Sequence, residues 1–214
     1  MTTIAVVDYG AGNLVSIEQA LAAAGARTVR LRAARPVEAD GLVVPGVGSA
    51  GSAIARLARR GLDATIRSWV DDGRPYLGIC LGLQLLFESS EEEDVRLLGM
   101  LPGRVVRLAS APRLPHIGWN QVALRERHAL FDGIEDGTDF YFVHSYAVAT
   151  GGGVLGMTEY GVSFASAVAV GSVAGVQFHP ERSGRDGLRL LANFVGIAAR
   201  ASGRSAARPV EEVA

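Results

Sequence analysis

The sequence predicts an α/β fold: a three-layer, open and mostly parallel sheet with helices on both faces, extended by β-rich additions. In the first third of the chain, β-rich runs alternate with runs of helical spacing, which favours a parallel sheet. From Arg104 to Phe178, short β-like runs follow one another instead, separated by turn signals such as Asp132-Gly133.

The alternating part is expected to run as far as Glu88. Its strands cover Thr3–Val7, Thr28–Leu31, Gly41–Val44 and Tyr76–Ile79, and its helices cover Asn13–Ala24, Ile54–Arg60, Ala64–Val70 and Leu81–Glu88. Asn13 is expected to cap the first helix and Gly25 to end it.

The second half is expected to be β-rich and to close with one helix. Its strands cover Val105-Val106, Gln121–Leu124, Phe140–Val143, Val154–Thr158, Ser163–Val170 and Val173–Phe178. The run from Gly161 to Phe178 carries no charge, but its glycines and serines favour two strands joined at Gly171-Ser172 over a membrane helix. The closing helix, Gly187–Ala199, is expected to present Leu188, Leu191, Val195 and Ala198 to the core.

No linker or repeat divides the chain, so residues 1–200 are expected to form a single domain. The Ala-, Arg- and Ser-rich segment 201–214 is predicted to be a disordered tail. Glu91–Asp94 is interpreted as a solvated loop, because four adjacent acids repel one another in a packed setting.

Composition excludes several classes of protein. A chain of 214 residues with one cysteine has no internal disulfide and no multi-cysteine zinc or iron–sulfur site, so no metal and no cofactor are expected. The net charge of −1 gives no electrostatic footprint for nucleic acid or membrane lipid. The N-terminus lacks the basic region of a signal peptide, and a cytoplasmic protein is expected.

The densest chemical signal is Gly78-Ile79-Cys80-Leu81-Gly82, where the fourth expected strand becomes a helix. This G-x-C-x-G pattern is typical of a nucleophile elbow, whose glycines permit a tight turn that presents the central side chain. The helix N-terminus after Cys80 would favour the thiolate over the thiol. The alternative is a buried core thiol, which is the usual environment of a lone cysteine.

A thiolate nucleophile needs a partner imidazole, and His179 is the candidate. Pro180 favours an extended conformation at His179, and in an extended segment residues two apart project to the same side. Glu181 is therefore expected to orient the imidazole. A structural role for His179, or a surface pair between Glu181 and Arg182, remains the alternative.

Acyl transfer also needs two hydrogen-bond donors for the developing oxyanion. The backbone N–H of Leu81, next to the nucleophile, is one candidate. The other is expected in Pro45-Gly46-Val47-Gly48, directly after the third strand, although a plain turn into a helix is equally compatible with that pattern.

Together these segments resemble the class I, or triad, glutamine amidotransferases. Within that family they look most like the glutaminase subunits of histidine biosynthesis. The segments that carry the resemblance span about residues 3 to 200 in the expected order: Asp8–Leu14, Pro45–Gly48, Gly78–Gly82, Pro115–Asn120, Tyr141–Tyr146 and Gly175–Glu181. Ala50 departs from the family, many of whose members carry an aromatic residue there.

The resemblance implies a mechanism. Cys80 would attack the side-chain amide of L-glutamine, His179 would protonate the departing ammonia and activate water, and Glu181 would orient His179. The oxyanion donors would be the amide of Leu81 and, after a rearrangement of the flexible Gly46-Val47 peptide, that of Val47. The residues implied in substrate binding are Gln84, Gly48, His144, Ser145 and Tyr146, although Gln84 is equally compatible with a helix surface.

The resemblance also implies a partner, a separate (β/α)8 cyclase subunit that receives the ammonia in a heterodimer. Glutaminases of this kind turn over slowly until the partner is loaded. Trp119 would be an interface anchor in the loop Pro115–Asn120, with Asn120 and Asn13 beside it. The alternative for Trp119 is local packing under that loop.

Three other functions remain open. The glutaminase subunits of pyridoxal phosphate synthase or anthranilate synthase would share Cys80, His179 and Glu181 but lack Pro115–Asn120 and Tyr141–Tyr146. A stand-alone cysteine hydrolase of γ-glutamyl compounds would need no partner. A non-catalytic binding module on the same fold would be expected to have lost a triad residue.

Overall fold

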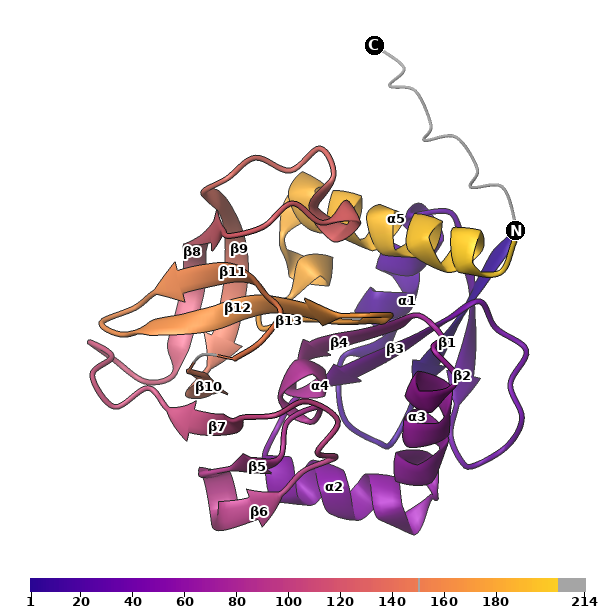
Figure 1. Cartoon of the computed structure of the whole chain (residues 1–214), viewed down its shortest axis with the longest axis horizontal. Helices are drawn as coiled ribbons and strands as arrows, with labels where there is room; N and C mark the ends of the chain where they lie inside the picture. The colour runs from indigo at the N-terminus through magenta and orange to yellow at the C-terminus, as the bar shows by residue number, and fades with distance from the viewer. Residues whose placement is uncertain (150, 204–214) are drawn as a thin grey trace.

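The computed structural model describes residues 1–149 and 151–203. One half of its sheet is parallel and one half is largely antiparallel (Figure 1). The parallel half contains, in spatial order, β2 (Ala26–Leu31), β1 (Thr2–Val7), β3 (Gly41–Gly46), β4 (Tyr76–Cys80) and β13 (Val173–Val176).

The sheet continues from β13 into the β-rich additions. The path runs through β12 (Ser163–Val170), β10 (Tyr146–Val148), β7 (Arg104–Arg107), β5 (Ser89–Ser90) and β6 (Val95–Arg96). A branch leaves β12 through β11 (Val154–Glu159), β8 (His116–Leu124) and β9 (Thr138–His144). The expected hairpin is present, since β12 and β13 pair antiparallel with Val170 opposite Val173.

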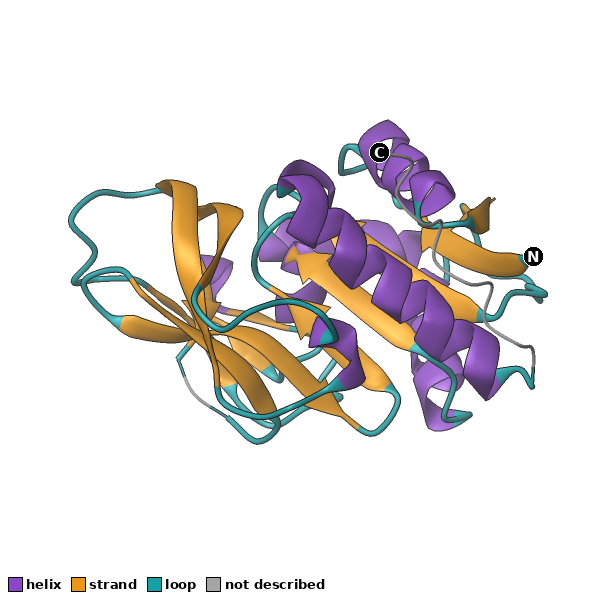
Figure 2. Cartoon of the chain, turned by 90° about the horizontal axis from the view of Figure 1, so that it is seen from above, coloured by secondary structure: helices purple, strands orange, loops and turns teal. Residues whose placement is uncertain are grey.

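Helices cover both faces of the parallel half (Figure 2). α1 (Leu14–Ala23) and α5 (Gly184–Ala201) pack on one face with Ile4 and Val6. α2 (Ala50–Arg59) and α3 (Leu62–Asp71) pack on the other with Ala5 and Val7. Successive residues of a strand point to opposite faces, so each buried strand supplies both cores. The predicted three-layer α/β fold is confirmed.

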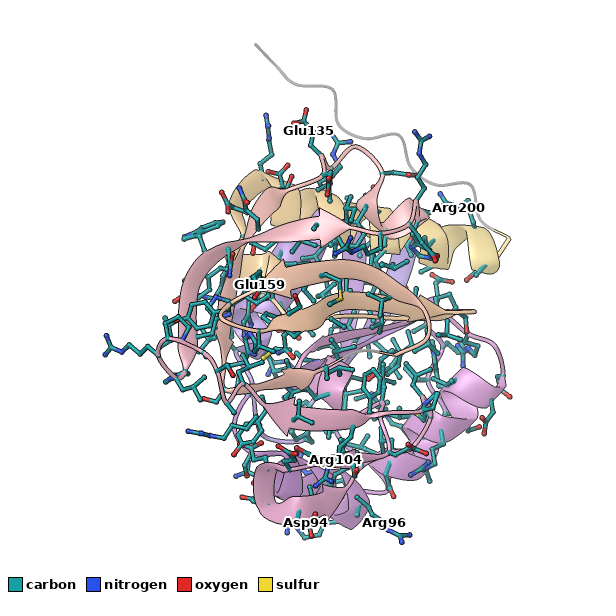
Figure 3. All side chains as sticks on the ribbon, turned by 60° about the vertical axis from the view of Figure 1, so that its left-hand side comes forward. Asp94, Arg96, Arg104, Glu135, Glu159 and Arg200 are labelled. Carbon is teal, nitrogen blue, oxygen red and sulfur yellow. The ribbon has the colours of Figure 1, made fainter. Side chains whose placement is uncertain are left out.

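Local signals act as expected at the first helix. The side chain of Asn13 caps α1 by accepting a hydrogen bond from the Ser16 amide at 3.4 Å. Charged side chains such as Asp94, Arg96, Arg104, Glu135, Glu159 and Arg200 are exposed and point outward (Figure 3).

Three expectations about elements are wrong. The helix after Cys80, α4, covers only Leu81–Gln84, because the chain then turns. The expected loop Pro115–Asn120 is mostly strand, since β8 begins at His116 and pairs with β9. Leu188 is 39% exposed; α5 instead buries a stripe spaced three and four residues apart, namely Gly187, Leu190, Leu191, Phe194, Val195, Ala198 and Ala199.

The acidic run is more structured than a solvated loop. Glu92–Asp94 forms a short 3₁₀ turn, η1, in which Glu92 accepts a hydrogen bond from the Ala50 amide at 2.9 Å. Glu91 accepts one from the Arg107 amide at 3.0 Å. Backbone donors thus hold two of these carboxylates. At the other end of the chain, α5 runs through Ala201, and residues 204–214 of the expected tail lie outside the described residues.

Candidate active site

Cys80 occupies a strained turn between β4 and α4. Its φ of 54° and ψ of −110° place a non-glycine residue in the left-handed region of φ. The flanking glycines are required by close packing, because a Cβ on Gly82 would collide with the Val44 carbonyl oxygen and one on Gly78 would lie 2.5 Å from the Gly82 oxygen. This is the geometry of a nucleophile elbow.

The Cys80 side chain is buried with the hydrophobic core but also contacts polar groups. Its sulfur is 3.8 Å from the Val143 carbonyl oxygen and 3.6 Å from Nε2 of Gln177. Cys80 itself is 5% exposed. Because α4 is only one turn long, these contacts and His179 are the groups that act on the sulfur, with little contribution from a helix dipole.

His179 is held both at its ring and at its backbone. Its Nδ1 is 2.9 Å from Oε1 of Glu181, and its backbone N–H donates to the Tyr141 carbonyl at 2.9 Å. Ser183 donates to the His179 carbonyl and accepts from the Tyr141 amide. His179 is extended as expected, with φ −103° and ψ 94°, but the residues after it form the 3₁₀ turn η3 (Pro180–Arg182), through which Glu181 reaches His179.

His179 is held in its charged form. Burial alone would lower its pKa, but hydrogen bonds with Cys80 and Glu181, together with their negative charges, raise the pKa to about 10. Glu181 occupies Nδ1, so Nε2 is the nitrogen left for Cys80. A charged imidazole of this kind can stabilise a thiolate and then donate a proton.

The expected oxyanion residues lie together. Gly46 is opposite Cys80 in the register of β3 and β4, and a Cβ on Gly46 would lie 2.8 Å from Cβ of Leu81. Val47 is 46% exposed, and Gly48 has a φ of +91°. The Pro45–Gly48 segment therefore lies beside the nucleophile, and Glu92 caps the following helix at Ala50.

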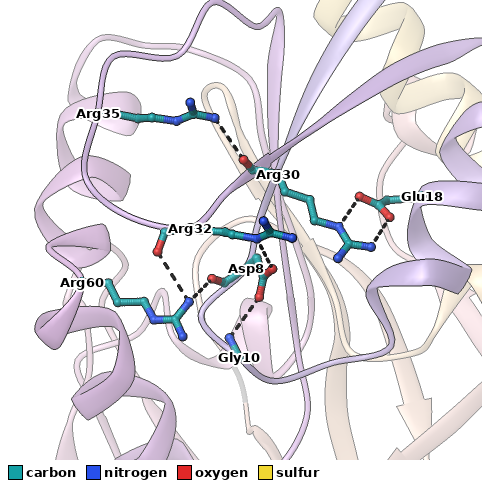
Figure 4. A network of polar contacts seen from close by, with 7 residues as sticks. All are labelled: Asp8, Gly10, Glu18, Arg30, Arg32, Arg35 and Arg60. Atoms are coloured by element: carbon teal, nitrogen blue, oxygen red, sulfur yellow. Dashed lines mark hydrogen bonds and ion pairs between the residues drawn. The ribbon is translucent and has the colours of Figure 1, made fainter.

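The opening motif, Asp8–Leu14, contacts the Pro45–Gly48 segment through Tyr9. Asp8 accepts hydrogen bonds from the Gly10 amide at 3.2 Å and from Arg32 at 3.1 Å, and Arg60, at the end of α2, donates to the Asp8 carbonyl (Figure 4). This network fixes the turn that carries Tyr9, whose hydroxyl would lie 2.5 Å from a Cβ on Gly46. Burial raises the pKa of Tyr9, so it stays a neutral phenol.

A small cavity of about 70 Å³ borders the Pro45–Gly48 segment. It is lined by Gly12, Asn13, Ile17, Pro45, Gly46, Val47, Ile79, His179, Glu181 and Arg182. It brings Asn13 to the same space as two triad residues. A larger hollow of about 540 Å³ lies along residues 124–136 and contains none of the expected site residues.

The expected substrate residues range from buried to exposed. Gln84 is 4% exposed, which rules out a helix-surface residue, and its Nε2 donates to the Tyr146 carbonyl at 2.8 Å. His144 is 6% exposed, and its Nδ1 also bonds the Tyr146 carbonyl, at 2.9 Å. Ser145 and Tyr146 are half-buried, and Gly48 is exposed.

Trp119 and its neighbours form an exposed face on β8. Trp119 is 57% exposed and Ile117 59%, so Trp119 is not packed under a loop. The Trp119 ring meets Tyr141 edge to face at 6.0 Å, and the Arg182 guanidinium lies 4.3 Å from the Tyr141 ring centre. Arg182 thus packs on Tyr141, and the ion pair of Glu181 is with His179.

Sequence reasoning missed two groups near the site. Gln177 contacts Cys80, and only its place two residues before His179 gave a signal. His116 bonds His144 at 3.1 Å, and Asn120 lies 3.3 Å from the other His116 nitrogen. Burial lowers the pKa of His116 to about 4 and that of His144 to about 3.

Two features are absent from residues 1–149 and 151–203. No group of three or more His, Cys, Asp or Glu side chains there is arranged to hold a metal ion. No helix in that part of the chain is long and apolar enough to cross a membrane.

Comparisons with known proteins agree with this geometry. The family model described as glutamine amidotransferase class-I matches residues 5–197. Imidazole glycerol phosphate synthase subunit HisH of Moorella thermoacetica is 48% identical over 207 residues, covering 91% of this chain and 94% of the relative. The subunit of the same name in Symbiobacterium thermophilum is 48% identical over 198 residues, covering 91% and 93%.

A solved structure titled as a glutamine amidotransferase superposes with a TM-score of 0.73 at 22% identity, covering 92% of this chain and 98% of that one. At that identity the likeness shows the fold alone. The family match and the identities over nearly the whole length go further: the chain belongs to the class I glutamine amidotransferases and, within them, to the HisH subunits of imidazole glycerol phosphate synthase.

Proposed function

We propose that this chain is the glutaminase subunit of an imidazole glycerol phosphate synthase. It hydrolyses L-glutamine to glutamate and ammonia and delivers the ammonia to a cyclase subunit that makes imidazole glycerol phosphate and AICAR in histidine biosynthesis. The observation that carries the proposal is the meeting of Cys80, His179 and Glu181 beside the Gly46–Leu81 contact.

The first half-reaction forms a thioester. The Cys80 thiolate attacks the side-chain amide carbon of glutamine, and the oxygen of that amide takes up the negative charge. The amides of Leu81 and Val47 stabilise the oxyanion, and Gly46 and Gly48 give the segment the freedom to present Val47. Charged His179 donates its Nε2 proton to the leaving nitrogen, so ammonia departs and a γ-glutamyl thioester remains.

The second half-reaction restores the enzyme. Neutral His179 takes a proton from water, the resulting hydroxide adds to the thioester carbon, and the carbon–sulfur bond breaks to release glutamate and the thiolate. Glu181 keeps Nδ1 of His179 protonated and its ring in one orientation throughout. Gln84, Gly48, His144, Ser145 and Tyr146 are proposed to line the amino-acid end of the substrate.

The partner is proposed to dock on the face that contains Asn13, Trp119 and Asn120. Exposed aromatic residues such as Trp119 are typical interface anchors. The small cavity supports this proposal, because Asn13 lines it together with His179 and Glu181. We further propose that residues 1–200 form one domain and that the protein is cytoplasmic. The basal glutaminase turnover is proposed to be low, because the Gly46-Val47 peptide limits it until the loaded partner binds.

Covalent labelling tests the nucleophile. A glutamine-analogue electrophile is expected to label the wild-type chain at Cys80 and to leave Cys80→Ala unlabelled. Cys80→Ala should lose about 10⁴-fold or more in glutaminase rate, as in other enzymes that lose a nucleophile. Labelling that survives the substitution would refute the assignment of Cys80.

A coupled assay with the purified cyclase tests the pathway. Glutamine plus this chain should replace ammonium as the nitrogen source. Cyclase activity with ammonium but not with glutamine would contradict the proposal. Full glutaminase activity of the isolated chain, unchanged by the loaded partner, would instead favour a stand-alone hydrolase.

A further inference from the structure

The side chain of Gln177 touches the sulfur of Cys80 but has no place in the mechanism above. Gln177 follows the last residue of β13 and is 0% exposed. Its backbone N–H is fixed by the Ser166 carbonyl of β12 at 2.8 Å. A fully buried amide requires hydrogen-bond partners, and the Nε2 of Gln177 has the Cys80 sulfur at 3.6 Å.

Gln84 fixes which end of the Gln177 amide faces the sulfur. The Tyr146 carbonyl can only accept, so the NH₂ group of Gln84 must face it, at 2.8 Å. The same NH₂ group lies 3.0 Å from Oε1 of Gln177. The oxygen of Gln177 is therefore occupied by Gln84, and its NH₂ group must point at Cys80.

Two groups contact the Cys80 sulfur, the backbone carbonyl of Val143 and the side-chain amide of Gln177, and they suit different protonation states of Cys80. The Val143 carbonyl at 3.8 Å accepts a hydrogen bond from a thiol and has nothing to accept from a thiolate. The Gln177 N–H donates to either state and binds the charged one more strongly. Ionisation of Cys80 therefore shifts the balance of its contacts from Val143 to Gln177.

We propose that Gln177 is a further catalytic residue whose amide N–H stabilises the Cys80 thiolate, and that Gln84 is a positioning residue acting through Gln177. The proposal rests on the proposed role of Cys80 as the nucleophile. It assigns Gln84 a task that precedes substrate binding, since the amide pair is complete without a ligand.

Alkylation of Cys80 by iodoacetamide in the absence of glutamine tests the role of Gln177. Gln177→Met keeps a similar volume and removes the donor. Its alkylation profile is expected to move about one pH unit higher, a tenfold loss in ionisation. The plateau rate at high pH should rise about threefold, because a more basic thiolate is more nucleophilic. Gln19→Met makes the same change on the exposed face of α1 and should leave the profile unmoved.

A double-mutant cycle tests the role of Gln84. Gln84→Met should move the alkylation profile in the same direction as Gln177→Met, and the two changes together should add little to Gln177→Met alone. Glutaminase kcat at pH 7 should fall about tenfold in both single variants. A Gln84→Met chain with an unmoved profile and only a raised KM would overturn the positioning role.

Loss of folding in a variant does not remove the test. In the wild-type chain, the Nε2 protons of Gln177 should change their NMR shifts as Cys80 ionises, and those of Gln121 should not. Unmoved Gln177 resonances, or an unmoved profile in folded Gln177→Met, would overturn the inference. If glutamine-analogue labelling of Cys80 still succeeds, the proposed function survives that outcome.

Discussion

The catalytic edge of the parallel half and the neighbouring β8–β9 hairpin use histidine in opposite ways. At the catalytic edge, the pKa of His179 is raised to about 10 although the residue is buried. In the hairpin, burial lowers the pKa of His116 to about 4 and that of His144 to about 3. Burial is common to all three, so the partners decide the charge.

The partners of the hairpin histidines are neutral and fix their tautomers. His144 must donate from Nδ1 to the Tyr146 carbonyl, so its Nε2 accepts from Nδ1–H of His116. The remaining His116 nitrogen then accepts from Asn120. His116 also stacks between Phe142 and Tyr160, at 5.0 and 3.9 Å. A charge is thus confined to His179, where the reaction needs it.

The largest effect is expected from removing the carboxylate that distinguishes His179. Glu181→Gln should lower the pKa of His179, because it removes one of the two groups whose hydrogen bond and charge raise it, and Cys80 remains as the other. By analogy with other triads, kcat should fall about 10⁴-fold while the fold is kept. Glutaminase assays and an NMR titration of His179 measure both effects.

A matched comparison is available in the same spectra. The resonances of His116 should keep their titration in Glu181→Gln, because burial alone lowers the pKa of that residue. A His179 that still titrates near pH 10 without the carboxylate would show that Cys80 alone holds its charge.

A smaller effect is expected on stability in acid, and it comes from the histidines of the β8–β9 hairpin. An unfolded histidine titrates near pH 6.5, above the pKa of folded His116 and His144, so the unfolded chain binds more protons below that pH. The free energy of unfolding should therefore fall as the pH drops from 7 to 4. His116 alone contributes about 3 kcal/mol to this fall. His179, whose pKa is raised, contributes stability that is lost only as the pH rises toward 10.

His116→Phe isolates that contribution. The variant keeps a ring between Phe142 and Tyr160, so its free energy of unfolding at pH 7 serves as the reference. The quantity to compare is the slope of that free energy with pH. Urea unfolding at pH 7 and pH 4.5 should show a shallower acid loss than in the wild type. An unchanged slope would mean that His116 has the same pKa in the folded and the unfolded chain.

The parallel half was predictable from the sequence because its signals are local. Asn13 caps α1 as expected, and the glycines around Cys80 mark the elbow. The sequence also indicated the pairing of Cys80 with His179, because a thiolate nucleophile needs a partner imidazole. The parallel pairing of β4 with β13 brings the carboxyl ends of both strands to one edge of the sheet. The geometry between His179 and Glu181 was reached through a 3₁₀ turn that the extended-segment argument did not foresee.

The polar contacts of the β-rich half have no local signal. Gln177 meets Gln84 across 93 residues, and His116 meets His144 across 28. Gly118, with a φ of +136°, breaks the strand-like pattern of β8, so a loop was expected where pairing with β9 in fact begins. In the β-rich half, the partners of these side chains come from strands far away in the sequence. A pattern within one segment cannot predict such pairing.

The smallest effect is expected from an exposed ion pair in the same parallel half. Arg32 and Asp8 lie 3.1 Å apart, close to the 2.9 Å of His179 and Glu181, but the Arg32 side chain is 66% exposed against 9% for His179 (Figure 4). Water screens the exposed pair, so Arg32→Gln should cost about 0.5 kcal/mol or less and leave glutaminase activity unchanged. Urea unfolding at low and high salt measures the cost. A cost well above that range would mean that Asp8 needs Arg32 to hold the turn at Gly10, and that distance, more than burial, sets the strength of such pairs in this protein.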